Sequence, residues 1–492
     1  MSSSVVIALD QGSSSSRALA VDSRGRIISK SQIPVRIHYP RPGWAEHDAL
    51  ELALSQERAL GAVLSRLPRG CEVLGLGLAC QRSTVILWDK DSGRPISRAP
   101  SWQDGRAAQL VASLQSRQAE AHKTTGLYLT PYYSAPKMRW FLEHSAAARR
   151  LARSKRLMIG PVGTFLAWRM SRGEVFAVDP TLAQRMMLLN LESLDWDRSM
   201  LEMFGLDPAW LPALLPSVAE WGFCRAGSRR LKLLACLGDQ QAAAIGLGGA
   251  RLGSSVANYG TGAFFLHNTG SRLHRIPGLL SSVGWTEARG QPCFFQEGTV
   301  HAAAASFDWL RSQIGILDGS SHIDRLCRRS RQRVLALPAI GGLGAPRWDY
   351  VTQTAFFGLN SKTTPADLVR GVAEGIAFLI ADIVAAMRSG GLDLGEVRVS
   401  GGLSRIGYLM QFQADMLGLT LSRCSLPEAT AMGAAFLAAR AAGADWADVL
   451  QKPKVDSLFK PAMSRQAREG LLQAWSRFVA AQAKLSREVK LS

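Results

Sequence analysis

One pattern occurs twice in this chain and constrains its fold more than any other. An apolar strand runs into a turn of glycine and hydroxyl residues, and a second apolar strand leaves that turn, at residues 5–21 and again at 254–270. The first copy contains ALDQGSSSSRA and the second contains NYGTGAF. Strands joined by so short a turn form an antiparallel hairpin. We therefore predict two related halves that each begin with a hairpin and meet near residues 245–253.

The segments after each hairpin alternate between strand and helix patterns. In the first half we expect a third strand after the turn DSRG, a helix from about Asp48 to Leu67, and central strands at 72–80 and 84–90. In the second half we expect a helix at 364–389, a strand at about 396–400 and a helix at 429–443. This order predicts an α/β fold with mixed sheets and flanking helices. We divide it into domains 1–246 and 247–492, with a ligand cleft between two lobes.

Composition limits the class of protein. A chain of 492 residues exceeds one ordinary core, and 47% hydrophobic with 20% charged residues is typical of soluble globular proteins. The start lacks a signal peptide, and Glu374 and Asp382 interrupt the longest apolar helix, so we predict no membrane span. The seven cysteines are scattered, without a C-x-x-C pair, which favours reduced thiols in the cytoplasm over disulfides or a zinc site.

The net charge of +19 raises the question of a nucleic-acid partner. Basic clusters occur at 149–156, 225–232 and 325–333, but the aromatic residues stand in apolar segments elsewhere. A nucleic-acid surface would interleave cations with stacking aromatics, and no helix-turn-helix, zinc-finger or RNP pattern is present. We therefore predict no nucleic-acid partner and interpret the charge as a surface that attracts anionic substrates.

Three glycine and hydroxyl turns each follow an apolar strand, at 10–16, 259–262 and 400–404. Glycine permits close backbone approach, and the N–H groups and hydroxyls of such turns form concave sites for phosphate. Ordinary hairpins use the same residues, so one turn alone means little, whereas three favour a nucleotide. None of them fits the P-loop or the dinucleotide-binding pattern.

Two aspartates stand where strands end. Asp10 precedes the first turn, where a carboxylate could hold Mg²⁺ beside phosphates or could only cap its own Asx-turn. Asp239, in LLACLGDQQAAAIGLG, lies between a strand and a small-residue helix that begins at about Gln240. An aspartate there is commonly a helix N-cap, but at the floor of a cleft it could accept a hydroxyl proton during phosphoryl transfer.

A polyol site needs polar groups for hydroxyls and aromatic edges for C–H faces. Taken singly, an arginine near a strand end is a surface charge and aromatic residues are core residues. Taken together with Asp239, the candidates form a plausible polyol site; they are Arg82, Trp102, Tyr132, Gln240 and Phe264.

An ordered set of motifs spans nearly the whole chain: ALDQGSSSSRA, PGWAEHD, QRST, WQD, PYYSAPK, LDWD, GDQQAA, NYGTGAFFLHNTG, GLGAPRWD, FFGLN, LMQFQADMLG and TAMGAAFLA. In these motifs the chain resembles the FGGY family of carbohydrate kinases and, within it, the glycerol kinases. The resemblance implies a two-lobed, actin/hexokinase-like (ribonuclease H-like) kinase fold that closes over ATP, Mg²⁺ and substrate. It also implies that the small-residue helices beginning near Gln240 and Ala429 connect the lobes.

The resemblance implies a role for each candidate. Asp239 becomes the general base on the substrate hydroxyl and, with Asp10, lies near Mg²⁺. The implied substrate-pocket residues are Arg82, Ser83, Trp102, Tyr132, Asp239, Gln240 and Phe264. The implied nucleotide-binding residues are Ser13, Ser14, Ser15, Arg17, Gly260, Thr261, Ala304, Asp308, Gly401, Gly402 and Ile406. Homodimers and homotetramers are common among such relatives, so either is possible here.

Departures from the family pattern concern the substrate and the adenosine. Glycerol kinases carry Glu directly after the pocket arginine, where this chain has Ser83, which removes a hydrogen-bond acceptor and leaves room for a larger substrate. On the adenosine side, Ala304, Asp308 and Ile406 replace the usual Gly, Gln and Asn. We predict an ATP-dependent kinase of a terminal hydroxyl on a small polyol or sugar, similar to glycerol kinases. The alternatives are a kinase of xylulose, ribulose or erythritol, and a catalytically weak sugar-sensing regulator.

Overall fold

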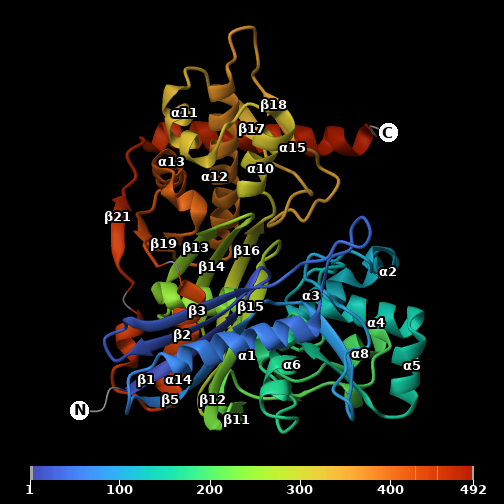
Figure 1. Cartoon of the computed structure of the whole chain (residues 1–492). Coiled ribbons are helices and arrows are strands. Elements are labelled where there is room, and N and C mark those ends of the chain that lie inside the picture. The colour runs from blue at the N-terminus through green and yellow to red at the C-terminus, as the bar shows by residue number, and fades with distance from the viewer. Residues whose placement is uncertain (1–3, 427, 452, 490–492) are drawn as a thin grey trace.

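Both predicted hairpins are present, each inside its own large mixed sheet, in the computed structural model, which describes residues 4–426, 428–451 and 453–489 (Figure 1). The first sheet has the strand order β11 (Val218–Ala226), β12 (Arg229–Gly238), β5 (Glu72–Cys80), β1 (Ser4–Gln11), β2 (Ser15–Asp22) and β3 (Ile27–Pro34). The second has the order β15 (Leu280–Trp285), β16 (Cys293–Val300), β14 (Ala263–Gly270), β13 (Ser255–Tyr259), β19 (Val397–Ser400), β20 (Leu421–Cys424) and β21 (Val455–Phe459).

The two sheets share one topology. From β3 to β11 the neighbouring pairs are antiparallel, antiparallel, parallel, parallel and antiparallel. From β16 to β21 the same five pairings occur in the same order, and β15 is an additional strand beyond β16. The predicted duplication is therefore confirmed at the level of strand order. The domain division at residue 246 stays a prediction.

Strand β1 shows why the first sheet lies at the centre of its lobe. Its residues alternate between two cores: Val5, Ile7 and Leu9 pack in one, whereas Val6 and Ala8 pack in another. Strands covered on both faces read as continuous apolar runs, which explains VVIAL. On one face lie α1 (Ala49–Ser65) and α6 (Val162–Met170), and on the other lies α14 (Ala429–Ala441).

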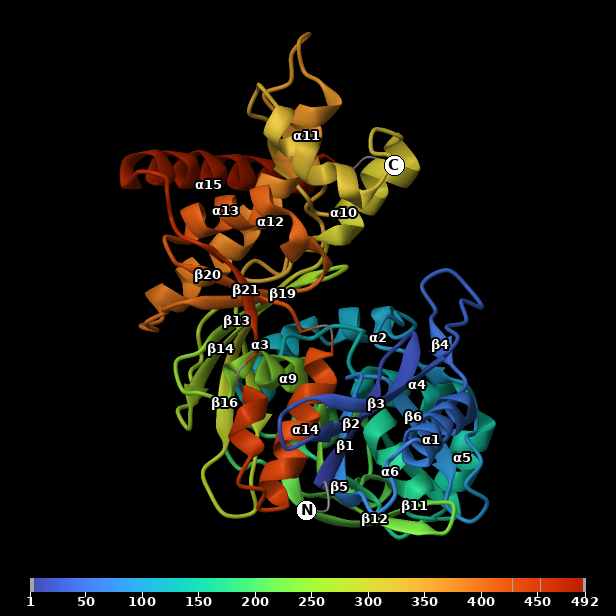
Figure 2. The ribbon, with the colours of Figure 1, turned by 60° about the vertical axis from the view of Figure 1, so that its left-hand side comes forward.

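Helix α14 belongs to the second half of the sequence but lies against β1, β5 and β12 of the first sheet (Figure 2). It packs beside α9 (Asp239–Ala244). Glycine makes this approach possible, because a Cβ on Gly246 would overlap the carbonyl of Ala429 and a Cβ on Gly433 would overlap the carbonyl of Ala242. Ala and Gly in the two segments beginning near Gln240 and Ala429 therefore allow the close approach of these helices, as predicted.

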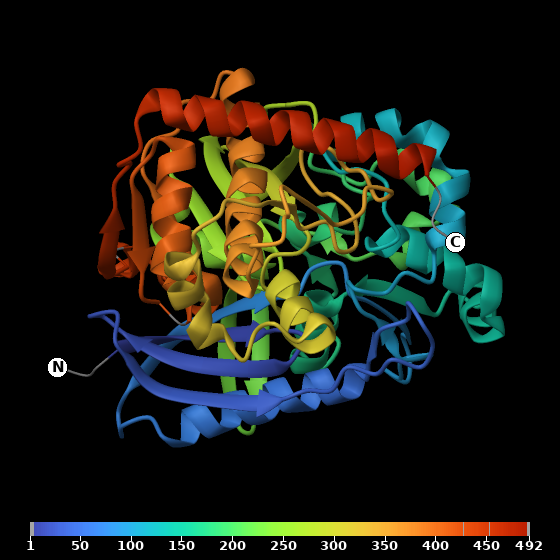
Figure 3. The ribbon, with the colours of Figure 1, turned by 90° about the horizontal axis from the view of Figure 1, so that it is seen from above.

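The second lobe is built around α12 (Pro365–Ser389), with α11 (Ile323–Arg329) and α13 (Gly407–Leu417) beside it. Helix α15 (Arg465–Glu488) crosses the outer side of this lobe (Figure 3), where Trp475 stacks on Phe378 with ring centroids 4.9 Å apart. Glu374, which interrupts the apolar stretch of α12, is buried and pairs with Arg333 and Arg370. None of the helices in the described ranges meets the length and hydropathy of a membrane span.

The remaining elements are short and surround the two sheets. The helices are α2 (Ala108–Ser113), α3 (Gln118–Thr125), α4 (Ser134–His144), α5 (Ala146–Arg153), α7 (Pro180–Gln184), α8 (Arg198–Phe204) and α10 (Ala304–Trp309). The strands are β4 (Glu46–His47), β6 (Val85–Asp89), β7 (Ala99–Pro100), β8 (Leu157–Pro161), β9 (Ala177–Val178), β10 (Ala213–Leu214), β17 (Leu335–Leu337) and β18 (Ala355–Phe357). All seven cysteines are free thiols.

One strand prediction is wrong in its placement. The segment 84–90 was expected as a central strand, but β6 pairs with β8 in a separate two-stranded sheet. Residues on β6 are buried on both faces, so the apolar run VILW has the composition of a central strand without being one. The expected helix from Asp48 is confirmed, and the Asp48 carboxylate caps α1 by accepting from the N–H groups of Leu50 and Glu51.

Candidate active site

The first glycine and hydroxyl turn joins β1 to β2 at residues 12–14. Gly12 N donates to Ser15 O (3.0 Å), and Trp102 Nε1 donates to Ser13 Oγ (2.9 Å). Ser14 is exposed. Ser15 lies in β2, and its buried hydroxyl accepts from Gln32 Nε2 (3.2 Å). Ser13 and Ser14 therefore remain on the turn as hydroxyls that a phosphate could reach.

Asp10 lies at the end of β1, beside this turn, and is almost fully buried. Its carboxylate accepts from Arg17 Nη1 (3.3 Å), and no hydrogen bond of an Asx-turn is formed to it in the described part of the chain. Arg17 also approaches Glu428 Oε2 (3.8 Å), so this arginine pairs with two carboxylates. Burial, with the nearby charges of Asp239 and Glu428, raises the pKa of Asp10 to about 7.

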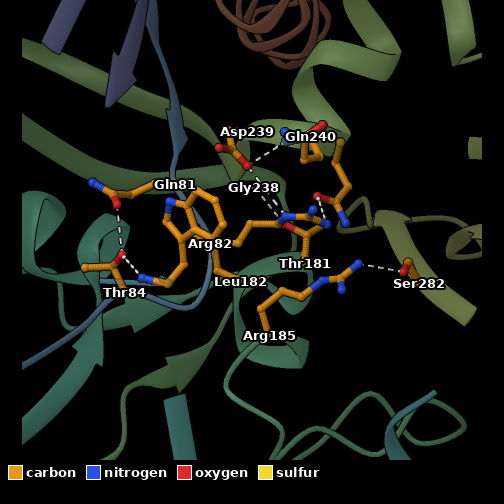
Figure 4. A network of polar contacts seen from close by, with 12 residues as sticks. Gln81, Arg82, Thr84, Thr181, Leu182, Arg185, Gly238, Asp239, Gln240 and Ser282 are labelled. Carbon is orange, nitrogen blue, oxygen red and sulfur yellow. Dashed lines mark hydrogen bonds and ion pairs between the residues drawn. The ribbon is translucent and has the colours of Figure 1, made fainter. Parts of the chain in front are cut away.

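Asp239 is the first residue of α9, directly after β12 ends. The cap residue is Gly238, so Asp239 is not the N-cap, although its Oδ1 accepts from the Gln240 N–H (2.7 Å). A Cβ on Gly238 would lie 2.9 Å from Arg82 Cδ, so glycine lets the arginine pass closely. Arg82 Nε lies 3.5 Å from Asp239 Oδ1 (Figure 4). Burial raises the pKa of Asp239, which Arg82 offsets only in part.

A second ionic cluster orients Arg82 from its other side. Glu297, on β16 and 1% exposed, accepts from Arg82 Nη1 (3.4 Å) and Nη2 (3.5 Å) and also pairs with Arg185. Ser282 Oγ donates to the same carboxylate (2.9 Å). Burial alone would raise the pKa of Glu297, but Arg185 and Arg82 outweigh it and lower the pKa to about 2. The cluster joins both halves of the sequence and holds the Arg82 guanidinium beside Asp239.

Sequence reasoning missed Arg185, Glu297 and Ser282. The available signal was an isolated charge within an apolar run, as in CFFQEGTV and in TLAQRMMLLN. A buried charge needs a partner or a function, so such a residue identifies a buried cluster without naming its partners.

Two of the predicted aromatic residues are exposed, and the third packs against a core cluster. Trp102 and Tyr132 are 41% and 42% exposed, and Phe264, on β14, is half-buried. The main chain of Trp102 donates to Thr84 Oγ1 (3.1 Å), and Thr84 Oγ1 donates to Gln81 Oε1 (2.8 Å), which links the Trp102 loop to the Arg82 loop (Figure 4). The hydrogen bond from Trp102 to Ser13 joins this predicted substrate side to the first turn.

The second turn joins β13 to β14, and the start of α10 lies on it. Gly260 O accepts from Ala304 N (3.1 Å), and Thr261 O accepts from Ala303 N (2.9 Å). The third turn begins at Gly401, which has φ 93°; a side chain there would overlap the main chain of Tyr259 at the end of β13. These contacts place the start of α10 and Gly401 beside the end of β13.

Two predicted nucleotide residues do not join these turns. Asp308 is exposed and pairs with Arg311 (2.9 Å) on the same helix. The side chain of Ile406 is 6% exposed and packs in the apolar core of the second lobe, so its nucleotide contact stays a prediction. A Cβ built on Gly402 would have no heavy atom within 4 Å among the described residues.

The carboxylates of Asp10 and Asp239 fit Mg²⁺ in their chemistry. The charge of Asp239 raises the pKa of Asp10, and a bound cation would relieve that repulsion. Across the described ranges no group of three or more His, Cys, Asp or Glu forms a ready metal cage. Such an arrangement suits Mg²⁺, which usually keeps several waters and is shared with substrate phosphates.

The comparisons with known proteins agree with this arrangement. The N-terminal domain of the FGGY family of carbohydrate kinases matches residues 5–246, and the C-terminal domain of that family matches 255–442. The glycerol kinase of Thermus brockianus is 38% identical over 484 residues, which cover 96% of this chain and 97% of that protein. The glycerol kinase of Natranaerobius thermophilus is 36% identical over 485 residues, with 96% and 97% covered.

Among solved structures, Plasmodium falciparum glycerol kinase with ADP matches with a TM-score of 0.92 and 26% identity, over 100% of this chain and 99% of that one. Three findings agree: the repeated sheet topology, the turns at the ends of β1 and β13, and the sequence matches over the full length. The chain belongs to the FGGY family of carbohydrate kinases.

Proposed function

We propose that this chain transfers the γ-phosphoryl group of ATP to a terminal hydroxyl of glycerol or a closely related small polyol. As a member of its family the chain is an ATP-dependent kinase. The observation that carries the polyol assignment is the pair of Asp239 and Arg82 at the β12–α9 junction, with Trp102 connecting it to the first turn. The glycerol kinases that match along their whole length support the same substrate class.

In this proposal Asp239 takes the proton of the attacking hydroxyl. Its raised pKa makes the carboxylate a better proton acceptor than an exposed aspartate, and Arg82 fixes its orientation. Proton removal is only part of phosphoryl transfer, in which protein catalysis consists mainly of positioning and charge stabilisation. The fixed guanidinium of Arg82, held by Glu297, supplies a donor for a substrate hydroxyl at a defined place.

On the donor side, the main-chain N–H groups and hydroxyls of the turns at 12–14 and 260–262 would contact the phosphates. Bound Mg²⁺ would be held by Asp10 with Asp239 nearby, and it would neutralise the negative charge of the phosphates. Arg17 would exchange its contact with Asp10 for one with a phosphate oxygen, since guanidinium groups bind both.

The alternatives have less support. The full-length relatives are glycerol kinases, which does not favour a xylulose, ribulose or erythritol kinase. Asp10 and Asp239 are both retained, which does not favour a catalytically weak regulator. We further propose that the enzyme acts in the cytoplasm, which the free thiols support. A homodimer or homotetramer stays a prediction, as does the absence of a nucleic-acid partner.

An acceptor panel tests the proposed function. ADP release in the presence of ATP and Mg²⁺ is measured with glycerol, erythritol, xylulose and ribulose as acceptors. We expect glycerol to give the highest kcat/KM among them. A ketose that exceeds glycerol would replace the proposed substrate, and ADP release that no acceptor stimulates would refute the kinase assignment.

Ser83 gives a prediction about substrate preference. Its hydroxyl makes no hydrogen bond within residues 4–426, 428–451 and 453–489. Its φ of 64° is strained for any residue with a side chain, so Ser83→Glu adds no new backbone strain. A carboxylate there would accept substrate hydroxyls, and hydrogen bonds to a charged group contribute about 1.5–3 kcal/mol. We expect Ser83→Glu to raise kcat/KM for glycerol relative to erythritol about tenfold or more. Ser83→Gln is the matched uncharged control, and an unchanged ratio for Ser83→Glu contradicts the prediction.

Asp10 gives a prediction about pH. Because its pKa is raised to about 7, its contribution to stability is present below the pKa of an unfolded aspartate, about 4, and is lost as the pH rises through about 7. Mg²⁺ binds the ionised carboxylate, so we expect Mg²⁺ with ADP to raise Tm more at pH 8 than at pH 6.

Differential scanning fluorimetry of wild type and Asp10→Asn measures this effect. The titration of the nucleotide itself is common to both proteins, so the difference between them reports Asp10. The variant should show a smaller rise in Tm with a weaker pH dependence. The same pH dependence in both proteins would show that Asp10 does not hold the cation.

A further inference from the structure

The first-lobe side chains proposed to contact the polyol come from three separate loops. Arg82 and Ser83 follow β5, Trp102 follows β7, and Tyr132 precedes α4. These loop residues lie outside the sheets and helices, and single backbone bonds such as Ser101 N to Ala45 O (2.8 Å) tie each loop to a neighbouring segment but not the three loops to one another. A substrate site whose side chains come from loops needs supporting contacts that hold those loops in fixed relative positions.

Lys137, on the first turns of α4, contacts all three loops. Its side chain is completely buried, and Nζ donates to Ser83 O (3.0 Å), Ser101 O (2.7 Å) and Tyr132 O (2.7 Å). An ammonium group has three protons, so each is used once and each loop receives one. Two of the acceptors belong to residues directly beside Arg82 and Trp102, and the third belongs to Tyr132 itself.

We propose that Lys137 is a positioning residue that holds the three loops of the polyol site in their relative places through one buried ammonium group. The inference rests on the proposed function, because the relative places of the three loops matter for catalysis only if their side chains contact a polyol. The three hydrogen bonds of Lys137 Nζ go to main-chain oxygens, so Lys137 holds the loops without occupying the side chains of Arg82, Trp102 and Tyr132.

The surroundings of Lys137 favour this role over that of an ordinary ion pair. Asp104, whose charge is favourable to the ammonium, forms its own short ion pair with Arg106 (2.7 Å). Burial lowers the pKa of Lys137 to about 7, which shows how unfavourable the site is for a cation. The three carbonyl oxygens compensate for that burial, and an apolar side chain of the same length would leave them without this donor.

The backbone at Ser83 provides a second, independent sign. Its φ of 64° is strained for a residue with a side chain, and its carbonyl accepts from both Lys137 Nζ and Ser134 Oγ (3.2 Å). Strain of this kind persists where surrounding contacts determine the conformation. The loop that carries Arg82 is therefore held in a conformation that these two donors stabilise.

Hydrogen–deuterium exchange and steady-state kinetics of three variants test the inference. Lys137→Met keeps most of the length but removes every donor, Lys137→Gln keeps an amide with two N–H donors, and Ser134→Ala removes only one donor to Ser83 O. In the nucleotide-free protein, we expect Lys137→Met to increase exchange at residues 81–84, 101–104 and 130–133 together. Ser134→Ala should increase it at 81–84 alone.

In the kinetic arm, Lys137→Met should raise KM for the acceptor at least tenfold while KM for ATP stays within twofold, and Lys137→Gln should lie between the two. If Lys137→Met does not fold, the same split is required of Lys137→Gln. The acceptor in these assays is the one that gives wild type its highest kcat/KM. If wild type phosphorylates no acceptor, the proposed function is refuted, and the exchange measurement still tests whether Lys137 holds the three loops. Exchange that rises throughout the first lobe, or equal changes in both KM values, would show a merely structural role and overturn the inference.

Discussion

Replacing Asp239 by asparagine is expected to lower kcat by about 10²- to 10⁴-fold, the usual contribution of a positioned general base. The carboxylate lies at the β12–α9 junction, 3.5 Å from Arg82, and burial raises its pKa. Asparagine keeps its size and can still accept the hydrogen bond from Gln240 N, but it cannot take up a proton. Steady-state kinetics with saturating ATP and acceptor measure the effect.

Two observations separate a catalytic loss from a damaged fold. The ionised form of Asp239 is disfavoured in the folded protein, so a neutral side chain should not lower Tm. The dissociation constant of ADP, measured without Mg²⁺ by calorimetry, should stay within a few-fold of wild type. Turnover within tenfold of wild type would remove Asp239 from the role of base, and a lost ADP affinity would assign it to nucleotide binding.

The second large effect is expected at Glu297. Glu297→Gln removes the buried carboxylate that pairs with both Arg82 and Arg185, and removing one member of a buried ion pair costs about 3–5 kcal/mol. The lowered pKa of Glu297, about 2, means that its ionised form stabilises the folded protein. That stability is present above the pKa of an unfolded glutamate and is lost as the pH falls through about 2.

A matched control is available on α8. Glu202 forms an exposed i,i+4 pair with Arg198 at 2.8 Å, and exposed pairs contribute little to stability. Thermal unfolding should show a large fall in Tm for Glu297→Gln and almost none for Glu202→Gln. The Glu297 variant should also raise KM for the acceptor, because Arg82 loses its orientation. Equal changes in Tm for the two variants would contradict the account of this cluster.

The sequence predicts the parts of the fold that depend on local pattern. The hairpins at β1–β2 and β13–β14 follow from apolar strands that flank short glycine turns, and α1 and α12 follow from helix periodicity with a cap. The wrong placement of β6 has the opposite origin: the pattern VILW indicates a buried strand but cannot say which sheet it joins.

The site is predictable only where a residue's role depends on its own element. Asp10, Asp239 and the two turns lie at strand ends, and strand ends are visible in the sequence. Glu297 and Arg185 are 112 residues apart, and Lys137 reaches three loops, so these contacts exist only after the chain has folded. The Ser15 hydroxyl accepts from Gln32, and Ile406 packs in an apolar core, so the predicted nucleotide contacts of these two residues stay predictions.

The most direct test identifies the phosphorylated product. Wild-type enzyme is incubated with glycerol, ATP and Mg²⁺, and ³¹P NMR follows the nucleotide and any new phosphomonoester, with Asp239→Asn as the parallel sample. The account predicts one equivalent of a phosphomonoester on a terminal carbon for each ADP formed by wild type, and almost none from the variant. ADP formed together with free phosphate alone, or equal product from both proteins, would contradict it.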